Sequence, residues 1–409
     1  MGEDAGGDHL IAPSNTTGVT QRARDGEPPA AILLLGAFPP QAQGIPGYCG
    51  ALAAALAAHG PVQALGFKAM YPRWLFPGVK TAMDPTSQPP NAENLTVRHP
   101  LAWYNPAGWL WHAWRTPADI VHIQWWSLPL FPVCLAFALV ARLRGKPVVV
   151  TVHNVLPHES SPWFLRASRL LCRRAGHVIV HSEANRRQFL EHYNPDPDRV
   201  SCIPMGVDAA AAPLPAPESA RRRLGLPADR PTLLCFGTIR SYKGLADLLR
   251  ALAIVRAMHP AVQLLIAGKP WEPWGPYQAL IDALGLGECV HTMLDYIPEE
   301  NVATCFAAAD LAVLPYTHFD AQSAVGAQVL AAGRPLIVTD TGGLPELVGH
   351  DPRWIAPPND PDVLAEKIRA FLDDPEGATT NFAEIAARAV TWAASAEAHW
   401  AVYSVGCRL

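Results

Sequence analysis

The stretch 233–255 constrains the fold more than any other part of the sequence. An apolar run ends at Gly237, which predicts a buried strand followed by a turn. From Leu245 onward, apolar residues recur at helical spacing. The turn carries Arg240 and Lys243, and two cations before a helix N-terminus suit an anionic group such as a diphosphate. An ordinary strand-to-helix loop with solvated cations has the same local pattern.

The first half of the chain has the same order of elements. A strand is predicted over 31–35, a loop over 37–48 and a helix from about 49 to 58, before a second strand. This order predicts a doubly wound α/β sheet, in which ligands bind at the carboxyl ends of the strands. Gly44 and Gly47 lie in the predicted loop, but their spacing is not that of a dinucleotide fingerprint.

The length of 409 residues exceeds the size at which single cores stop growing, so we expect more than one domain. Residues 1–27 have the composition of a disordered tail. Two α/β units of similar size are predicted over 28–208 and 209–385, and the segment 209–220, which contains only Ala, Pro, Leu, Glu and Ser, marks the domain linker. The last helix, within 386–409, is expected to cross back to the first unit.

Composition excludes several classes of protein. The formal net charge of −4 argues against a nucleic-acid binder. The eight cysteines are scattered without a CxxC pair, which indicates reduced thiols rather than a disulfide framework or a zinc site. The start has no signal-peptide pattern, so we expect a cytoplasmic protein. The apolar run 123–141 is interrupted by Pro129 and Pro132, which favours a buried helix over a membrane span.

Residues 67–118 are predicted to be irregular and contain a group of tryptophans. Such rings stack on sugars, sit at a lipid interface or cover a small core, and the pattern leaves these three interpretations open. A later predicted helix has an arginine-rich face that would suit either anionic lipid headgroups or solvent. The tryptophans are Trp103, Trp109, Trp111 and Trp114, and the arginines are Arg166, Arg169, Arg173 and Arg174.

Polar residues follow a predicted strand at 148–152. His153 comes directly after it, where an imidazole can donate a hydrogen bond to a substrate hydroxyl or accept a proton. His158 and Glu159 follow, but their spacing is not that of a helical zinc motif and no third ligand is evident, so no metal site is predicted.

Several segments, taken together, resemble the family 4 glycosyltransferases, which are retaining enzymes of group 1 with the GT-B fold. The first half agrees more loosely, through Gly44 to Gly47, His153, Ser182 and the segment Pro204–Asp208. The resemblance covers most of residues 30–350. The matching segments of the second half are Phe236–Leu245, Ala309–Pro315, Gly333–Val338 and Gly342–Val348.

This resemblance implies two Rossmann-like domains that face each other across a cleft. It also implies transfer of a sugar from a nucleotide-diphosphate donor, with Arg240 and Lys243 holding the diphosphate and no metal or other cofactor required. His153 would reach the donor sugar from the first domain, whereas Gly44 and Gly47 would shape the loop near the acceptor.

The resemblance further implies a set of donor-binding residues in the second domain. The family usually has two glutamates, eight positions apart, before the Gly333 turn; this chain has Asp320 and Gln328 there. Gln328 can still bond a ribose hydroxyl but carries no charge. The complete expected set is Gly237, Asp320, Ser323, Gln328, Gly342, Gly343 and Glu346.

The function expected from the sequence is that of a hexosyltransferase. Its acceptor would be lipid-linked or a polysaccharide, and the enzyme would work at the cytoplasmic face of the plasma membrane with peripheral contact to anionic lipid. Two alternatives stay open: a catalytically silent sugar- or partner-binding subunit, for which the change at the two glutamate positions argues, and a nucleotide-sugar epimerase of the same architecture.

Overall fold

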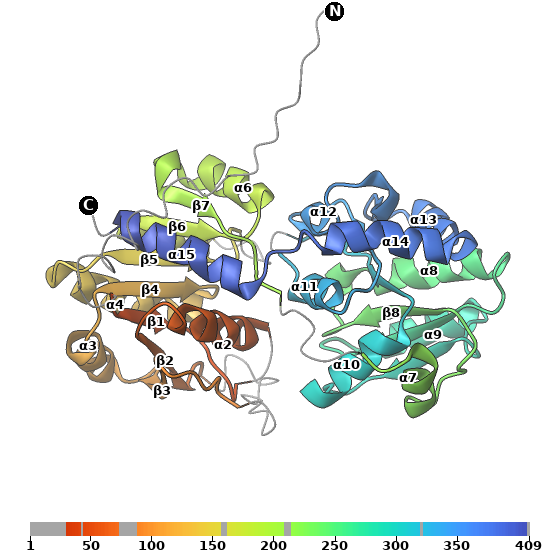
Figure 1. Cartoon of the computed structure of the whole chain (residues 1–409), viewed down its shortest axis with the longest axis horizontal. Helices are drawn as coiled ribbons and strands as arrows, with labels where there is room; N and C mark the ends of the chain where they lie inside the picture. The colour runs from red at the N-terminus through yellow and green to blue at the C-terminus, as the bar shows by residue number, and fades with distance from the viewer. Residues whose placement is uncertain are drawn as a thin grey trace, which may run out of the picture.

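The computed structural model describes residues 30–41, 44–72, 88–156, 162–207, 214–319 and 322–406. These residues form two α/β units side by side, each built on one parallel sheet (Figure 1). The predicted pair of Rossmann-like domains is thereby confirmed. The predicted tail 1–27, part of the linker, His158, Glu159 and Asp320 lie outside the described residues.

The N-terminal unit has a seven-stranded sheet in the order β3-β2-β1-β4-β5-β6-β7. Its central strands are buried along their whole length, which explains why they are almost entirely apolar in sequence. The strands are β1 (Ile32–Leu35), β2 (Val62–Ala69), β3 (Leu95–Ala102), β4 (Ile120–Trp125), β5 (Val148–Val152), β6 (His177–Val180) and β7 (Val200–Cys202).

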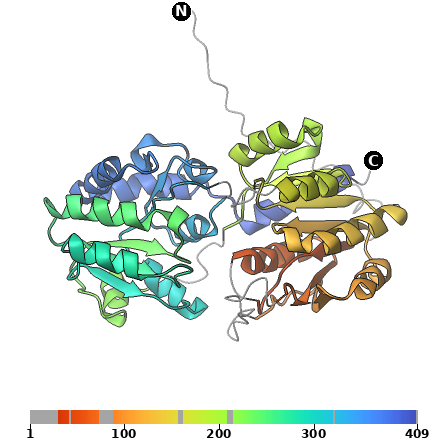
Figure 2. The same ribbon diagram turned by 180° about the vertical axis from the view of Figure 1, so that it is seen from behind.

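Helices cover both faces of this sheet. Four of them share one apolar core on one face (Figure 2): α3 (Pro106–Arg115), α4 (Phe131–Leu143), α5 (Pro162–Cys172) and α6 (Glu183–Tyr193). On the other face lie α2 (Gly44–Ala57) and the last helix of the chain, α15 (Trp392–Gly406).

The C-terminal unit has a six-stranded parallel sheet in the order β10-β9-β8-β11-β12-β13. Its strands are β8 (Thr232–Phe236), β9 (Gln263–Ala267), β10 (Val290–Met293), β11 (Leu311–Leu314), β12 (Leu336–Thr339) and β13 (Ile355–Ala356). Its helices are α7 (Pro217–Arg223), α8 (Leu245–Arg256), α9 (Gly275–Ala283), α10 (Glu299–Ala308), α11 (Ala324–Ala331), α12 (Leu344–Leu347), α13 (Pro361–Asp373) and α14 (Pro375–Ala386).

The chain returns to the N-terminal unit after α14. Near this return, Val207 forms an isolated parallel bridge with Thr391, so the two crossing segments lie side by side. A Cβ on Gly206 would lie only 2.5 Å from the Trp392 ring, so this close approach of the two segments requires glycine. Beyond this point α15 packs on α2, and the Trp400 indole donates to the carbonyl of Leu56 at 3.3 Å.

Two predictions about local structure are wrong. Gly44 and Gly47 lie in α2 rather than in a loop, and a Cβ at either position would meet no atom within 4 Å. The first turn of a helix tolerates Pro46 because its N–H groups have no partner inside the helix. The segment 67–118, predicted to be irregular, contains β3 and α3. Among the described helices, none has the length and apolar character needed to cross a bilayer.

Candidate functional site

The loop between β8 and α8 is folded tightly against the end of β11. Gly237 and Gly244 both have positive φ angles, +98° and +68°. A Cβ on Gly244 would lie only 1.7 Å from the carbonyl oxygen of Pro315, so this close approach requires glycine. The single 3-10 turn Ser241–Lys243 between them carries Lys243 to the carboxyl ends of the central strands.

Lys243 is a buried cation. Its residue is 9% exposed, and its ammonium lies 5.4 Å from the ring centroid of Tyr316. Burial lowers the pKa of Lys243, because desolvation disfavours the charged form. No carboxylate of the described residues lies within ion-pair distance of its ammonium. A bound anion would supply the missing counter-charge.

Arg240 lies in the same loop and is held by a neighbouring segment. Its guanidinium carbon lies 4.0 Å from the ring centroid of Trp271, a close cation–π contact. The segment after β9 is bonded to the loop through its backbone, since Trp271 N–H donates to the carbonyl of Ile239 at 3.0 Å. The Glu272 carboxylate accepts from the N–H of Ser241, also at 3.0 Å. Trp271 and Glu272 therefore determine how the loop presents Arg240.

The N-terminus of α11 lies beside this loop. Ser323 is buried, and its hydroxyl caps the helix by accepting from the N–H of Gly326 at 3.2 Å. A Cβ on Gly237 would be 3.0 Å from the Lys243 ammonium and 3.1 Å from a methyl of Val325, so the buried cation and the first turn of α11 are neighbours. A helix N-terminus next to a lysine forms a favourable site for a phosphate group.

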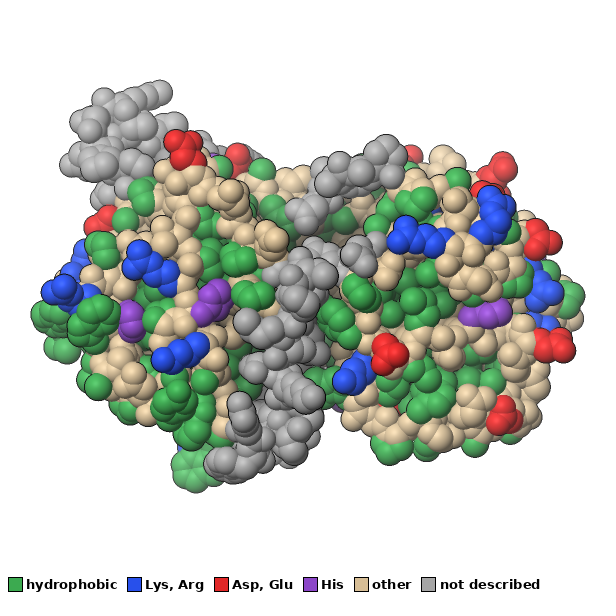
Figure 3. Space-filling view, turned by 90° about the horizontal axis from the view of Figure 1, so that it is seen from below, with side chains coloured by type: hydrophobic (Ala, Val, Ile, Leu, Met, Phe, Trp, Pro, Cys, Tyr) green, Lys and Arg blue, Asp and Glu red, His purple; other side chains and the backbone are tan. Residues whose placement is uncertain are grey.

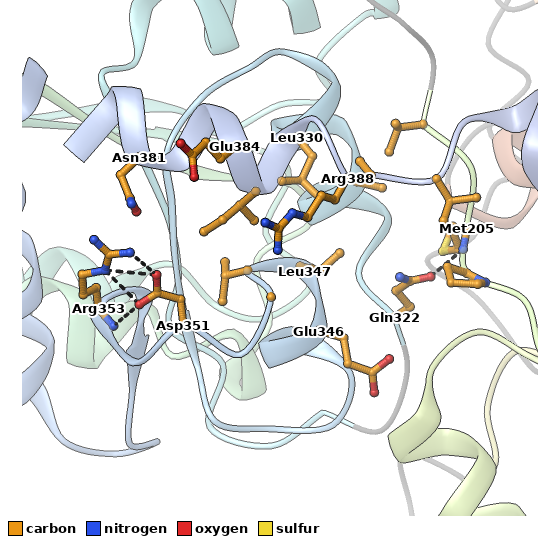
Figure 4. A pocket seen from close by; sticks show the side chains of 18 residues that line it. Met205, Gln322, Leu330, Glu346, Leu347, Asp351, Arg353, Asn381, Glu384 and Arg388 are labelled. Atoms are coloured by element: carbon orange, nitrogen blue, oxygen red, sulfur yellow. Dashed lines mark hydrogen bonds and ion pairs between the residues drawn. The ribbon is translucent and has the colours of Figure 1, made fainter. Parts of the chain in front are cut away.

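Two side chains of the C-terminal unit make three hydrogen bonds with the N-terminal unit. The carboxylate of Glu346, on α12, accepts from the N–H groups of Glu183 at 3.0 Å and Ala184 at 2.9 Å, at the start of α6. The side-chain oxygen of Gln322 accepts from the N–H of Met205 at 2.7 Å. In Figure 4, Glu346 points away from Arg388 and toward the ribbon of the N-terminal unit.

A cavity of about 380 Å³ lies behind these bonds. Its lining includes Leu330, Leu347, Asp351 and Arg388, whereas Arg240 and Lys243 do not line it (Figure 4). The cavity is therefore separate from the cation loop.

The carboxyl ends of β4, β5 and β6 carry a buried polar network. His153 Nε2 lies 2.8 Å from the side-chain oxygen of Gln124, and its Nδ1 lies 3.3 Å from Nε2 of His181. His181 Nδ1 lies 3.0 Å from the carbonyl oxygen of Ile203. The network continues from Gln124 to His122, at 3.2 Å. Both ring nitrogens of His153 are thus engaged inside the N-terminal unit.

The protons in this network follow from its acceptors. The Ile203 carbonyl only accepts, so His181 carries its proton on Nδ1, and a neutral His181 must accept from Nδ1 of His153. The Nε2 of His153 then needs a hydrogen-bond donor, which Gln124 provides when the oxygen and nitrogen of its amide are exchanged. When the Gln124 oxygen faces Nε2 instead, His153 must donate from both ring nitrogens, so the two rings together carry one extra proton. Burial lowers the pKa of His153 well below its usual range and that of His181 to about 4, which favours the neutral pair.

The structure brings together only part of the expected site. Gly237, Lys243 and Ser323 lie close together, and Arg240 is in the same loop. Gly342, with a positive φ, and Gly343 precede α12. Gln328 is exposed on α11.

Sequence reasoning missed four residues of these arrangements: Trp271, Glu272, Gln124 and His181. Gln124 is the last residue but one of β4, His181 directly follows β6, and Trp271 follows β9 closely. The rule that sites lie at the carboxyl ends of parallel strands, applied to every strand, would have found these three.

Comparisons with known proteins agree with this architecture. The chain is 30% identical to a D-inositol 3-phosphate glycosyltransferase of Kineococcus radiotolerans over 249 residues, and 28% identical to a glycogen synthase of Mycobacterium tuberculosis over 278 residues. These matches cover 56% and 65% of this chain. The chain spans only 57% and 62% of the length of these relatives.

Solved structures share the fold over nearly the whole chain. A sucrose-phosphate synthase from Thermosynechococcus elongatus superposes with a TM-score of 0.69 at 22% identity, covering 91% of this chain and 98% of the other. Anabaena HepE in complex with UDP superposes with a TM-score of 0.69 at 18% identity, covering 92% and 100%.

Each half of the chain also matches a family model. Residues 45–211 match the model described as Glycosyltransferase Family 4, and residues 217–389 match Glycosyl transferases group 1. Together these matches span more than half of the chain, and it belongs to the group 1, family 4 glycosyltransferases with the GT-B fold.

Proposed function

We propose that this chain is a retaining hexosyltransferase that uses a nucleotide-diphosphate sugar as donor. The observation that carries the proposal is the buried Lys243 without a carboxylate partner, beside the N-terminus of α11 and in one loop with Arg240. A diphosphate satisfies this arrangement, since it would compensate the ammonium, bond the guanidinium and accept from free amides of α11. Structures of the related fold with UDP and with UDP-glucose support this choice of ligand.

In this proposal the cations of the protein stabilise the leaving group. Lys243 and Arg240 neutralise the charge that develops on the diphosphate as the bond to the sugar breaks, so a metal ion is not required. Gln328 would bond the ribose, and the amides near Gly342 and Gly343 would face the donor. His153 would reach the donor sugar by exchanging its bond with Gln124 for one with a sugar hydroxyl.

We place the acceptor at a membrane. A lipid-linked saccharide or a growing polysaccharide would enter from the N-terminal unit, and the enzyme would act at the cytoplasmic face of the plasma membrane through peripheral contact with anionic lipid. The arginines of α5 support this placement, because a basic helix face attracts anionic headgroups.

A donor screen tests the proposal. The purified chain is incubated with UDP-, GDP- and ADP-sugars in the presence of EDTA, and release of the nucleoside diphosphate is measured together with the heat of binding of each diphosphate. We expect one nucleotide to bind and its sugar to be consumed. Lys243→Met should remove turnover, whereas Lys367→Met, a half-buried lysine of the same unit, should leave it unchanged.

The other outcomes separate the alternatives. Binding of a diphosphate without any turnover, also in a variant with Gln328→Glu, would indicate a silent binding subunit. Release of an altered nucleotide sugar without an acceptor would indicate an epimerase. If no nucleotide binds at all, the proposal is wrong.

A further inference from the structure

One side of the N-terminal unit exposes an unusual number of large apolar side chains. Of the twelve large hydrophobic residues that are exposed among the described residues, nine lie between Trp103 and Leu170. They belong to α3, α4, α5 and the turn before α3. These nine, called here the aromatic face, are Trp103, Tyr104, Leu110, Trp111, Trp114, Leu139, Leu143, Trp163 and Leu170.

The helix α3 shows why this face is not explained by the core. Its residues Trp109 and Ala113 point inward and are buried in the core of the unit. Leu110, Trp111 and Trp114 are more than half exposed, at 52%, 57% and 56%. An ordinary surface helix has polar residues on that side. Packing within the described chain therefore leaves the outer side of α3 uncovered.

The charge of the same segment is strongly biased. Residues 103–176 contain eight Lys or Arg and only two Asp or Glu, whereas the whole chain contains 32 and 36. One of the two acids, Asp119, is paired with Lys146 at 3.5 Å. An otherwise acidic chain thus concentrates positive charge where it exposes its tryptophans.

Arginines and tryptophans alternate on this surface. The guanidinium groups of Arg115, Arg144 and Arg166 lie 5.8, 5.7 and 5.0 Å from the ring centroids of Trp111, Trp114 and Trp163. At the ends of α4 and α5, Leu139 and Leu143 line a shallow groove together with Arg142, Arg173 and Arg174. Figure 3 shows hydrophobic and basic side chains mixed over this end of the N-terminal unit.

We propose that the aromatic face is a docking surface for an anionic lipid bilayer. Tryptophan and tyrosine rings prefer the headgroup level of a membrane, and the neighbouring arginines would bond lipid phosphates. A bilayer fits better than a protein or a glycan, because the surface spreads over three helices and pairs three of its five aromatic rings with an arginine. The helix α3 lies at the end of its unit that is remote from the C-terminal unit, so docking there leaves the C-terminal unit free to move (Figure 1).

This inference builds on the proposed membrane location and assigns it to particular residues. It does not depend on sugar transfer, and its test uses no donor, so failure of one proposal is distinguishable from failure of the other. The full chain is mixed with phosphatidylcholine vesicles, with or without about 30% phosphatidylglycerol, and sedimented. We expect binding to the anionic vesicles only, weakening with salt, together with a blue shift of tryptophan fluorescence.

Two double variants test the surface itself. Arg142→Glu with Arg173→Glu should lower the vesicle partition coefficient at least about 25-fold, since each basic residue near such a surface contributes about fivefold. Trp111→Ser with Trp114→Ser should lower it at least about tenfold. Their matched control is Arg222→Glu with Arg223→Glu, which changes the same charge at exposed positions of the other unit. Circular dichroism and thermal unfolding check that every variant is folded.

Three results would overturn the proposal. The first is wild-type protein that does not bind anionic vesicles, and the second is equal loss of binding in the control variant. The third is sedimentation of the wild type as a dimer that the tryptophan variant converts to a monomer, without any vesicle binding, since a second copy of the chain would then cover the face.

Discussion

Both units have buried ionisable groups at the carboxyl ends of their sheets, but, in the part of the chain that the structure describes, only those of the N-terminal unit have hydrogen-bonding partners that complete them. In the C-terminal unit, Lys243 is buried without a carboxylate partner among the described residues. In the N-terminal unit, His153 and His181 bond each other, and Gln124 and the Ile203 carbonyl complete their bonds. The lysine side is therefore incomplete without an anion, whereas the histidine side is complete without any ligand.

This difference indicates where binding energy is gained. An anion that reaches Lys243 removes the cost of a buried charge, so the C-terminal unit should bind the donor before the acceptor side takes part. A sugar hydroxyl that reaches His153 must first displace an existing hydrogen bond, which makes that contact selective rather than strong.

The largest effect is expected at Lys243. Replacing it with Met should lower kcat by about 10³-fold, as for the loss of one group that stabilises developing negative charge. The same change should raise the free energy of unfolding of the ligand-free protein by at least about 1 kcal/mol, because an unpaired buried charge is removed. Turnover and chemical denaturation measure the two effects. A variant that loses both activity and stability would show that Lys243 is already paired in the free protein.

Much of this contrast was predictable from local sequence. The apolar run before Gly237 and the two cations after it lie within one strand–turn–helix unit, so their pattern alone predicted a loop suited to an anion. The parallel sheets followed from buried strands that alternate with helices.

The site contacts that the sequence did not predict depend on segments far apart in the sequence. Trp271 reaches Arg240 because β8 and β9 are neighbours, and His181 reaches His153 because β5 and β6 are. Glu346 was expected at the donor, but its carboxylate bonds the start of α6 in the other unit. The relative placement of the two units determines that contact, and no local pattern encodes it.

Acid should act on the N-terminal unit. Burial lowers the pKa of His399, a buried neighbour of His122, to about 4. In the unfolded chain this histidine has its usual pKa of about 6.5, so below about pH 6.5 the unfolded chain binds more protons than the folded one. Stability is therefore lost as the pH falls from about 6.5 toward 4. For His399 alone the loss between pH 7 and pH 5 is about 2 kcal/mol. His399→Phe should flatten the pH dependence of denaturant unfolding by that amount, and equal slopes for both proteins would contradict this.

A smaller effect is expected from Trp271. Trp271→Ala should weaken diphosphate binding about tenfold, because Arg240 loses the ring that orients it. Trp271→Phe keeps an aromatic face and should recover most of the affinity. Calorimetry with the preferred diphosphate measures both. Should the phenylalanine variant bind as weakly as the alanine variant, Trp271 would instead contact the nucleotide directly or support the loop by its size.

The smallest effect is expected where the two units meet. Glu346→Gln keeps the shape of the side chain but removes the charge that faces the N-terminus of α6, an interaction of about 0.5–1 kcal/mol. An arrangement in which the two units have moved apart and this contact is broken should therefore gain about two- to fivefold in population. The gain would be visible as a larger radius of gyration in solution scattering. Glu384→Gln removes the same charge from the exposed α14 and should change nothing. If saturating diphosphate restores the radius of the Glu346 variant, binding at Lys243 and closure of the units are coupled; an unchanged radius would show that the bond merely accompanies a closed state held by other contacts.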